Sequence, residues 1–449
     1  MKVGNTTNAF TSNSLGRGSS LFSRRKILQS LMLGMVAIHD KGILFADQVE
    51  TPNRQLSDRA KGLLIGTLLG DALGGPIEFQ DPVKVQLLAN PPKKWLANEV
   101  LDQAARDAAA QRIQLRTYRE LRPTPEPYGQ WSKNAAAGTV TDDSRHKMVL
   151  LEALRKADQA NSWPMTDQDL ARTYLAWSRK WDEESHADYR EISEEWLQEY
   201  GFSARWLLGE RDPSKALPLE RMWVGLPTCC GQMGLLPLAI IYAGQPEAAY
   251  LAAYHLAFFD NSWGRDLNAA LVAGLAQALV LDAEGKSPRD LWNSIIDGMR
   301  NTDPYRYSQV PWSQRPLERW LKFGLDTAKD AQHRPAQCFA RLDEEFSNTT
   351  KWEAHVPFVV MFSALELCEY DPLAALQLSM EWGHDTDSYA QLLGAFIGAL
   401  YGPQLFPTQQ TTLVNERLQS DYGEQLEEWV ELLVHLNSLS RQRTLIAVS

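Results

Sequence analysis

The stretch Tyr389-Ala-Gln-Leu-Leu-Gly394-Ala-Phe-Ile-Gly398-Ala-Leu-Tyr-Gly402 is apolar throughout and has glycine at every fourth position. Because residues four apart lie on one helix face, this pattern predicts a buried helix with a glycine ridge. Each interior glycine costs about 0.5–1 kcal/mol relative to alanine, so the ridge indicates that another backbone approaches closely there. Such spacing also marks paired membrane helices. This run, however, is shorter than the roughly 20 apolar residues that span a bilayer.

Small residues recur at the same spacing in two other stretches. One is Lys61-Gly-Leu-Leu-Ile-Gly-Thr-Leu-Leu-Gly-Asp71-Ala-Leu-Gly74, where Asp71 interrupts the apolar run. The other carries Ala270, Gly274 and Ala278. We therefore expect three closely packed core helices.

Two acidic clusters lie far apart in the chain, Thr141-Asp142-Asp143-Ser144 and Asp385-Thr386-Asp387-Ser388. Each has two carboxylates and two hydroxyls, the hard oxygen ligands that Mg²⁺, Mn²⁺ or Ca²⁺ prefers. For either cluster alone, an acidic helix N-terminus with capping side chains is an equally good interpretation. The second cluster, however, directly precedes the glycine-rich helix. We expect two loops to carry the acids inward, where they would repel one another without a cation.

Three motifs, in this order, resemble those of the ADP-ribosylglycohydrolases, the family that includes dinitrogenase reductase-activating glycohydrolase. They are Gly70-Asp-Ala-Leu-Gly-Gly-Pro-Ile-Glu78-Phe79, Gly138-Thr-Val-Thr141-Asp142-Asp143-Ser144 and Gly383-His-Asp385-Thr-Asp387-Ser388. The resemblance extends from about residue 58 to residue 405. It implies an all-α, single-domain orthogonal helical bundle.

The resemblance also implies a dinuclear metal site at the mouth of a cleft, with two Mg²⁺ ions, for which Mn²⁺ is a possible substitute. Glu78 would lie beside the metals. The ligands carried over by position are Thr141, Asp142, Asp143, Asp385, Asp387 and Ser388.

Catalytic roles are assigned to Glu78 and Asp143. Glu78 is the best candidate general acid or base, because some titratable group must exchange a proton between water and the leaving group. Two other roles for Glu78 stay open at this point, metal ligand and helix terminator.

One segment departs from the family pattern. Where relatives carry an Asn-Gly-Ala-Ala-Met-Arg-like sequence, this chain has Cys229-Cys230-Gly231-Gln232-Met233-Gly234-Leu-Leu-Pro237. We take Gly231 and Gln232 as candidate substrate contacts and leave the leaving group open. His384 occupies a position that is often glycine in the family, where it could orient a carboxylate or contact substrate.

These residues predict a metal-dependent hydrolase that cleaves the glycosidic bond of an ADP-ribosyl or related ribosyl group, on a small molecule or an ADP-ribosylated substrate. Two alternatives remain. One is a dinuclear metal phosphohydrolase, which would use the same ligands to clamp a phosphoryl group. The other is a non-catalytic protein of the same fold that binds ADP-ribose or another nucleotide.

The number of residues between Glu78 and Thr141 is large for the family, so residues 81–137 are expected to contain an insertion. Within it we expect an exposed helix near residues 104–112 and a turn-prone segment at residues 123–127. The four cysteines lack the spacing of a zinc site. Buried thiols are favoured over a Cys229–Cys230 disulfide.

Residues 1–46 contain Ser23-Arg24-Arg25-Lys26-Ile27-Leu28 before a modest apolar run, which resembles a twin-arginine export signal. A disordered basic tail is the alternative. Residues 47–449 would then form the mature domain, periplasmic or secreted and without a stable membrane anchor. Removing the signal would change the net charge from -11 to -16. A chain this acidic is a poor nucleic-acid binder, since phosphate contacts require Lys and Arg. The oligomeric state is left open.

Overall fold

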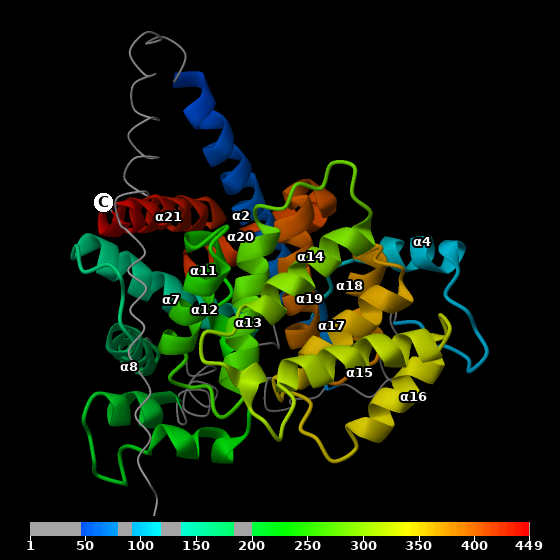
Figure 1. Cartoon of the computed structure of the whole chain (residues 1–449), viewed down its shortest axis with the longest axis horizontal. Helices are drawn as coiled ribbons and strands as arrows, with labels where there is room; N and C mark the ends of the chain where they lie inside the picture. Colours follow the sequence, from blue (N-terminus) through cyan, green and yellow to red (C-terminus); the bar gives the residue numbers. More distant parts are fainter. Residues whose placement is uncertain (1–45, 80–91, 118–135, 184–199, 449) are drawn as a thin grey trace, which may run out of the picture. The chain divides into compact units, whose positions relative to one another are not determined.

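The computed structural model describes residues 46–79, 92–117, 136–183 and 200–448. The chain divides into two compact units, Met1–Pro52 and Asn53–Ser449. Within the described residues every regular element is a helix, and one isolated antiparallel bridge joins Thr228 to Glu353. The predicted all-α fold is confirmed (Figure 1). None of the helices in this part of the chain is both long and apolar enough to cross a bilayer.

The helices follow one another along the chain in this order: α2 (Ala46–Gly74), η1 (Gly75–Ile77), α4 (Gln103–Gln111), α7 (Asp142–Gln159), α8 (Asp167–Glu183), η2 (Leu219–Gly225), α10 (Cys230–Gly234), α11 (Leu238–Ile241), α12 (Pro246–Leu256), α13 (Gly264–Ala278), α14 (Pro288–Asn301), η3 (Tyr307–Gln309), α15 (Pro316–Asp330), α16 (Pro335–Glu345), α17 (His355–Leu367), α18 (Pro372–Glu381), α19 (Thr386–Tyr401), η4 (Pro403–Leu405), α20 (Thr408–Tyr422) and α21 (Leu426–Val448).

The glycine ridges of α2 and α19 pack directly against each other. A Cβ atom built on Gly66 would lie 2.1 Å from the carbonyl oxygen of Gly394, and one on Gly398 would lie 1.9 Å from that of Gly62. No side chain fits at such distances, so the two backbones are in contact, as the spacing predicted. The helices run antiparallel, and this contact places the end of α2 beside the start of α19.

The third small-residue stripe packs differently. Helix α13 is buried along most of its length, as expected. However, a Cβ atom on Gly274 would lie 2.6 Å from the side-chain Cγ of Met299 on α14, not against a neighbouring backbone. The interpretation as a core helix is therefore confirmed, whereas close backbone approach at this stripe is wrong. Gly274 makes room for a methionine side chain.

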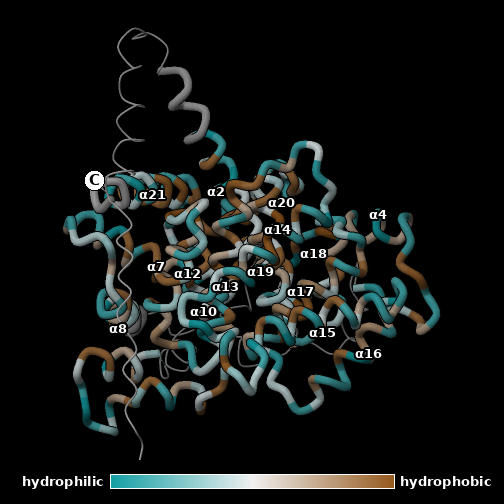
Figure 2. The backbone as a smooth tube through the Cα atoms, viewed as in Figure 1, coloured by the Kyte–Doolittle hydropathy of each residue, from teal (hydrophilic) through white to brown (hydrophobic). Residues whose placement is uncertain are grey.

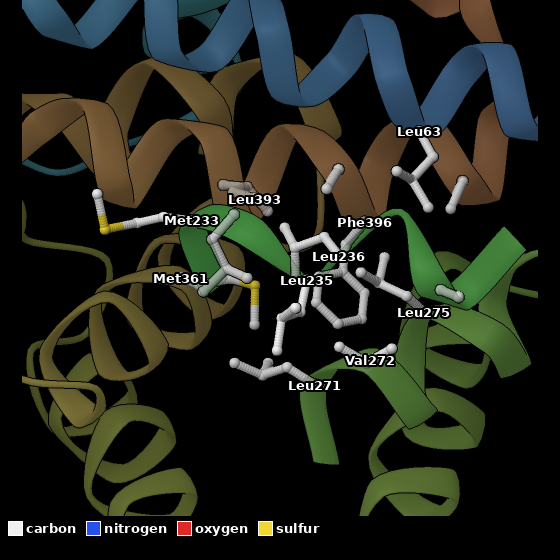
Figure 3. Packing of buried hydrophobic residues seen from close by; sticks show 14 of the residues in the cluster. Leu63, Met233, Leu235, Leu236, Leu271, Val272, Leu275, Met361, Leu393 and Phe396 are labelled. Carbon is white, nitrogen blue, oxygen red and sulfur yellow. The ribbon is translucent and has the colours of Figure 1, made fainter. Parts of the chain in front are cut away.

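Apolar side chains from several helices meet between these elements. In Figure 3, Phe396 of α19 lies close to Leu236, which follows α10, and to Leu275 of α13, and Leu63 of α2 lies at the edge of the same cluster. Helix α17 is buried on all sides. Along the outer helices α15 and α16, by contrast, hydrophobic and hydrophilic residues alternate along the tube (Figure 2). The core therefore surrounds α17 and α19.

Part of the predicted insertion is described. A helix is present at α4, and Asp102 caps it by accepting a hydrogen bond from the backbone N–H of Ala105 at 2.9 Å. The expected exposure is only partly correct, because Arg106 and Ala109 are buried on the side that faces α18. Residues 123–127 and the predicted signal segment lie outside the described residues. All four cysteines are buried free thiols.

Candidate metal centre

The first acidic cluster forms the N-terminus of α7. Thr141 is extended, and its hydroxyl oxygen accepts a hydrogen bond from the backbone N–H of Asp143 at 3.2 Å. Asp142 and Asp143 occupy the first turn, where the helix dipole favours negative charge. The capping interpretation is therefore correct for Thr141. It does not exclude metal binding, because the two carboxylates are not used for capping.

The second cluster forms the N-terminus of α19 and is tied to the end of α2. Gly383 and His384 turn the chain with positive φ angles of 85° and 67°. The carbonyl oxygen of His384 accepts from the backbone N–H of Phe79 at 2.8 Å, and the Thr386 hydroxyl donates to the carbonyl oxygen of Gly74 at 2.8 Å. These bonds fix Glu78, which immediately follows η1, next to Asp385.

The predicted acidic residues come together as two groups. Carboxylate oxygens of Glu78, Asp385 and Asp387 lie within 4.8 Å of one another, and so do those of Asp142, Asp143 and Asp387. Asp387 belongs to both groups. The geometry therefore provides two neighbouring candidate cation sites that share one carboxylate.

Burial and mutual repulsion disfavour the ionised forms of these acids. Burial, followed by the charge of Asp387, raises the pKa values of both Asp143 and Asp385 well above their usual range. Burial, followed by the charges of Asp142 and Asp71, raises the pKa of Asp387 to about 7. A divalent cation would reverse this effect, since opposite charge stabilises a carboxylate.

Two buried carboxylate oxygens support a metal more directly. Within the described part of the chain, neither Oδ1 of Asp143 nor Oδ2 of Asp385 has a hydrogen-bond partner. Buried polar atoms are nearly always paired, so oxygens left without a partner among the described residues are candidates to bind a cation. The donors are carboxylates and hydroxyls, which suit Mg²⁺, Mn²⁺ or Ca²⁺ and not a thiolate-preferring metal.

The predicted hydroxyl ligands lie at the edge of the acids. Ser388 donates to Oδ2 of Asp143 at 3.4 Å, and its oxygen is 3.8 Å from the sulfur of Cys229. Because Asp143 uses Oδ2 in this contact, its unpartnered Oδ1 remains for a cation. Thr141 lies one residue before Asp142, with its side chain buried.

Asp71 is a site residue that the sequence reasoning did not assign. Its carboxylate accepts from the backbone N–H groups of Thr141 at 2.9 Å and Ser144 at 3.0 Å, and also from the Ser144 hydroxyl. The side chain is completely buried. Asp71 therefore holds the first turn of α7 against α2. The signal that could have identified it is an acid inside an otherwise apolar glycine helix.

Lys147 is the second unassigned residue. Its ammonium group, fully buried, donates to the carbonyl oxygen of Asp143 at 3.0 Å and to Oε1 of Gln391 at 2.9 Å. The hydroxyl of Thr67 donates to the same Gln391 oxygen at 2.8 Å. This network joins α2, α7 and α19 next to the acidic residues. It also places one positive charge near an excess of carboxylates.

The predicted substrate contacts Gly231 and Gln232 are buried. The backbone N–H of Gly231 donates to Oδ1 of Asp260 at 3.0 Å. The Gln232 amide donates to Asn268 at 2.8 Å and to the carbonyl oxygen of Ala354 at 2.7 Å. These bonds attach the segment to the core beside α7 and α19. A contact of either residue with substrate stays a prediction.

The two histidines beside the clusters have different surroundings. Nδ1 of His146 is 2.8 Å from the Tyr174 hydroxyl in a buried aromatic group, so this side chain packs in the core. The side chain of His384 is partly exposed, 3.8 Å from Asp343 and against the ring of Trp382. Burial, followed by the charge of Lys351, lowers its pKa. Its contact with substrate also stays a prediction.

Comparison with known proteins gives a family match. A family model described as ADP-ribosylglycohydrolase matches residues 51–443. A solved chain described as "ADP-ribosylglycohydrolase-related protein complex" has 15% sequence identity and a TM-score of 0.49, with 86% of this chain and 99% of that chain covered. A comparison with curated proteins gives no match. The family match includes every predicted metal ligand.

The chain belongs to the ADP-ribosylglycohydrolase family, because the family model covers most of its length. The class of reaction associated with the family is glycoside hydrolysis.

Proposed function

We propose that this protein hydrolyses the glycosidic bond of an ADP-ribosyl or related ribosyl group with the help of two Mg²⁺ ions. The observation that carries the proposal is the pair of carboxylate groups sharing Asp387, with Glu78 in one of them. Family membership supplies the class of reaction. The unpartnered oxygens of Asp143 and Asp385 support cations at these positions.

The residues that would hold the ions are Thr141, Asp142, Asp143, Asp385, Asp387 and Ser388. Bound divalent cations can position hydroxyl groups and water and stabilise negative charge. Other buried side chains hold these ligand residues in position. Asp71 holds the turn that carries Asp142 and Asp143, and Lys147 links this turn to α19 through Gln391.

Glu78 is the proposed proton-transfer group. It is buried, near Asp385 and Asp387, and follows a short helical turn whose position is fixed by the Phe79–His384 hydrogen bond. A carboxyl group held in this way can give a proton to a leaving atom or take one from water. Asp143, oriented by Ser388, is proposed to act with it as both ligand and catalytic residue.

The proposed substrate is a small molecule or an ADP-ribosylated molecule, with no role for nucleic acid. The proposed location is the periplasm or the exterior, reached by twin-arginine export. That part of the proposal rests on residues 23–28 and the apolar run that follows them, which lie outside the described residues.

Product analysis tests the function against both alternatives. Purified protein is incubated with Mg²⁺ and ADP-ribosylated arginine or serine peptides, and with NAD⁺. Free ADP-ribose supports the proposal. Inorganic phosphate would indicate the phosphohydrolase. Binding of ADP-ribose with no product from any substrate would indicate the non-catalytic protein.

Glu78→Gln sharpens the test. We expect this variant to keep its affinity for Mg²⁺ and ADP-ribose and to lose roughly 10²- to 10⁴-fold in single-turnover rate, the usual contribution of a positioned acid or base. Glu427→Gln is the control, because Glu427 is an exposed partner of Lys61. If binding and turnover fall together, Glu78 is mainly a metal ligand. Near-normal turnover would remove it from the catalytic residues.

A further inference from the structure

A pocket of about 350 Å³ lies beside the metal centre. Its walls come from η1, α16, α18 and residues 92–95, and its apolar lining includes Ile77, Trp95, Phe339, Met380 and Trp382. We propose that this pocket receives the group released from the ribose, and that this leaving group is a flat aromatic or heteroaromatic ring. This inference rests on the proposed glycohydrolase function and specifies its substrate class.

The pocket and the metal centre share a wall. Ile77 and Gly383 line the pocket, and they directly precede Glu78 and His384 in the chain. The hydrogen bond between Phe79 and His384 joins the two strips of backbone that form this wall. Where the leaving atom needs a proton, a general acid at Glu78 has to reach it. The departing group is therefore expected on the Glu78 side of the site, where this pocket lies.

The lining favours an aromatic ligand. The indole N–H of Trp382 donates to Asp343 at 3.0 Å and that of Trp95 donates to Glu381 at 2.6 Å. Lys93 lies over the Trp95 ring and Tyr389 stacks with Trp382, so a ligand can contact only the parts of these rings that line the pocket. Aromatic rings stack on such surfaces with a gain of about 0.5–1.5 kcal/mol beyond burial alone.

The reaction balances with water as the only co-reactant. The bond between the anomeric carbon and the ring nitrogen or oxygen breaks, and its electron pair goes to the leaving atom. The oxygen of water bonds to the anomeric carbon. Where the leaving atom needs a proton, Glu78 supplies it and regains a proton from the attacking water. A cationic pyridinium leaves as a neutral molecule without taking up a proton, and in that case the proton of the water goes to solvent.

Direct binding to the pocket is tested first, without any turnover. Nicotinamide and benzamide are the probes. Their binding is measured by ligand-observed NMR with Mg²⁺ and ADP-ribose present. Ala336→Trp fills the pocket. Ala252→Trp is the matched control, because Ala252 lines a separate pocket of about 340 Å³. We expect binding to wild type and Ala252→Trp, and its loss in Ala336→Trp. Equal binding to all three proteins, or none to wild type, overturns the inference.

Turnover is tested second, with NAD⁺ as a substrate that releases a heteroaromatic ring. We expect Ala336→Trp to lower kcat/KM for NAD⁺ by at least about tenfold, in the range that pocket shape provides. Its dissociation constant for ADP-ribose should stay within about twofold. Phe339→Ala, which removes one aromatic face, replaces Ala336→Trp if the latter fails to fold. Unchanged NAD⁺ hydrolysis in the pocket variant overturns the inference and leaves the glycohydrolase function standing. Absence of ribosyl bond cleavage with every substrate overturns the function itself.

Discussion

Two groups of buried acids in this protein have opposite surroundings. On α13, the carboxylate of Asp266 accepts from Nη2 and Nε of Arg315 at 2.7 and 2.9 Å and from the Tyr250 hydroxyl at 2.6 Å. Arg315 also donates to the backbone carbonyl oxygen of Thr302 at 3.1 Å. At the metal centre, Asp143 and Asp385 each keep an oxygen with no partner in the described part of the chain.

The difference separates a structural charge from a functional one. The Asp266–Arg315 pair is complete within the chain, so nothing else has to bind there. The acids around Asp387 repel one another and outnumber the one ammonium group, that of Lys147, that is buried among the described residues. Burial of unpaired charge is costly, so folding alone does not explain why these acids are grouped. This grouping is what the proposed cation site would require.

The largest expected effect is on the Asp266–Arg315 pair. Arg315→Met leaves Asp266 buried and uncompensated, and should lower the free energy of unfolding by about 3–5 kcal/mol. Arg319→Met is the control, since Arg319 is exposed, pairs with Glu345 at 3.6 Å and lies over the ring of Trp320. Urea denaturation of both variants measures the difference. A loss no greater than that of the control would mean that the Asp266 pair is not the structural charge described here.

The second expected effect is on the acids around Asp387. Mg²⁺ at a hundred times its dissociation constant should raise the free energy of unfolding by about 2.7 kcal/mol, because the ion binds only the folded state. Chelator should remove the gain, and an equal ionic strength of NaCl should not reproduce it. Thermal melts with Mg²⁺, with chelator and with NaCl provide the measurement. Identical melting temperatures in all three would contradict a cation site at Asp387.

The third effect is a pH dependence of the metal-free protein. Burial raises the pKa of Asp387 to about 7 in the folded state, so this group favours folding at low pH and the benefit is lost as pH rises toward 7. Chelated protein should lose at least about 1.4 kcal/mol of stability between pH 5 and 8, the equivalent of one pKa unit. Mg²⁺ should flatten the slope.

Asp260 provides an internal control for that experiment. Burial also raises its pKa to about 7, but it bonds Gly231 and Asn268 and does not belong to either carboxylate group. The part of the pH slope that persists with Mg²⁺ is expected from Asp260 together with Glu353 and Glu381, whose pKa values burial also raises. Equal slopes with and without Mg²⁺ would break the link between the acids of the metal centre and a cation.

The smallest effect is a gain in stability. Asp387→Asn removes the carboxylate shared by both groups, and in chelator it should raise the free energy of unfolding by about 0.5–1 kcal/mol as repulsion is relieved. Asp142→Asn should show the same direction. Both variants should bind Mg²⁺ more weakly by titration calorimetry. Wild-type affinity in both would remove these residues from the site.

Much of the fold could be predicted from the sequence. The glycine spacing identified α2 and α19 and the contact between them, because repeated glycine is costly unless a backbone lies against it. The same reasoning failed for Gly274, where a methionine side chain lies in its place. Spacing shows that room is needed on a helix face, whereas the neighbour that uses the room is decided by tertiary packing.

The site shows the same limit. The oxygen-rich clusters, together with the family resemblance, predicted candidate metal ligands, and the structure brings their carboxylates together in two groups. Asp71 and Lys147 are single polar residues in apolar helices, and their partners come from other helices, so their roles depend on contacts that local sequence does not contain. The pocket beside Glu78 is likewise assembled from four segments of the chain.

The contact between α2 and α19 also determines where this protein tolerates a change of length. One residue inserted between Ser388 and Gly394 would turn the rest of α19 by about 100° and advance it by about 1.5 Å. A leucine would then face Gly66, where no side chain fits. Sequence drift in this family member should therefore accumulate insertions in its connecting loops, while the number of residues from Asp385 to Gly402 stays constant.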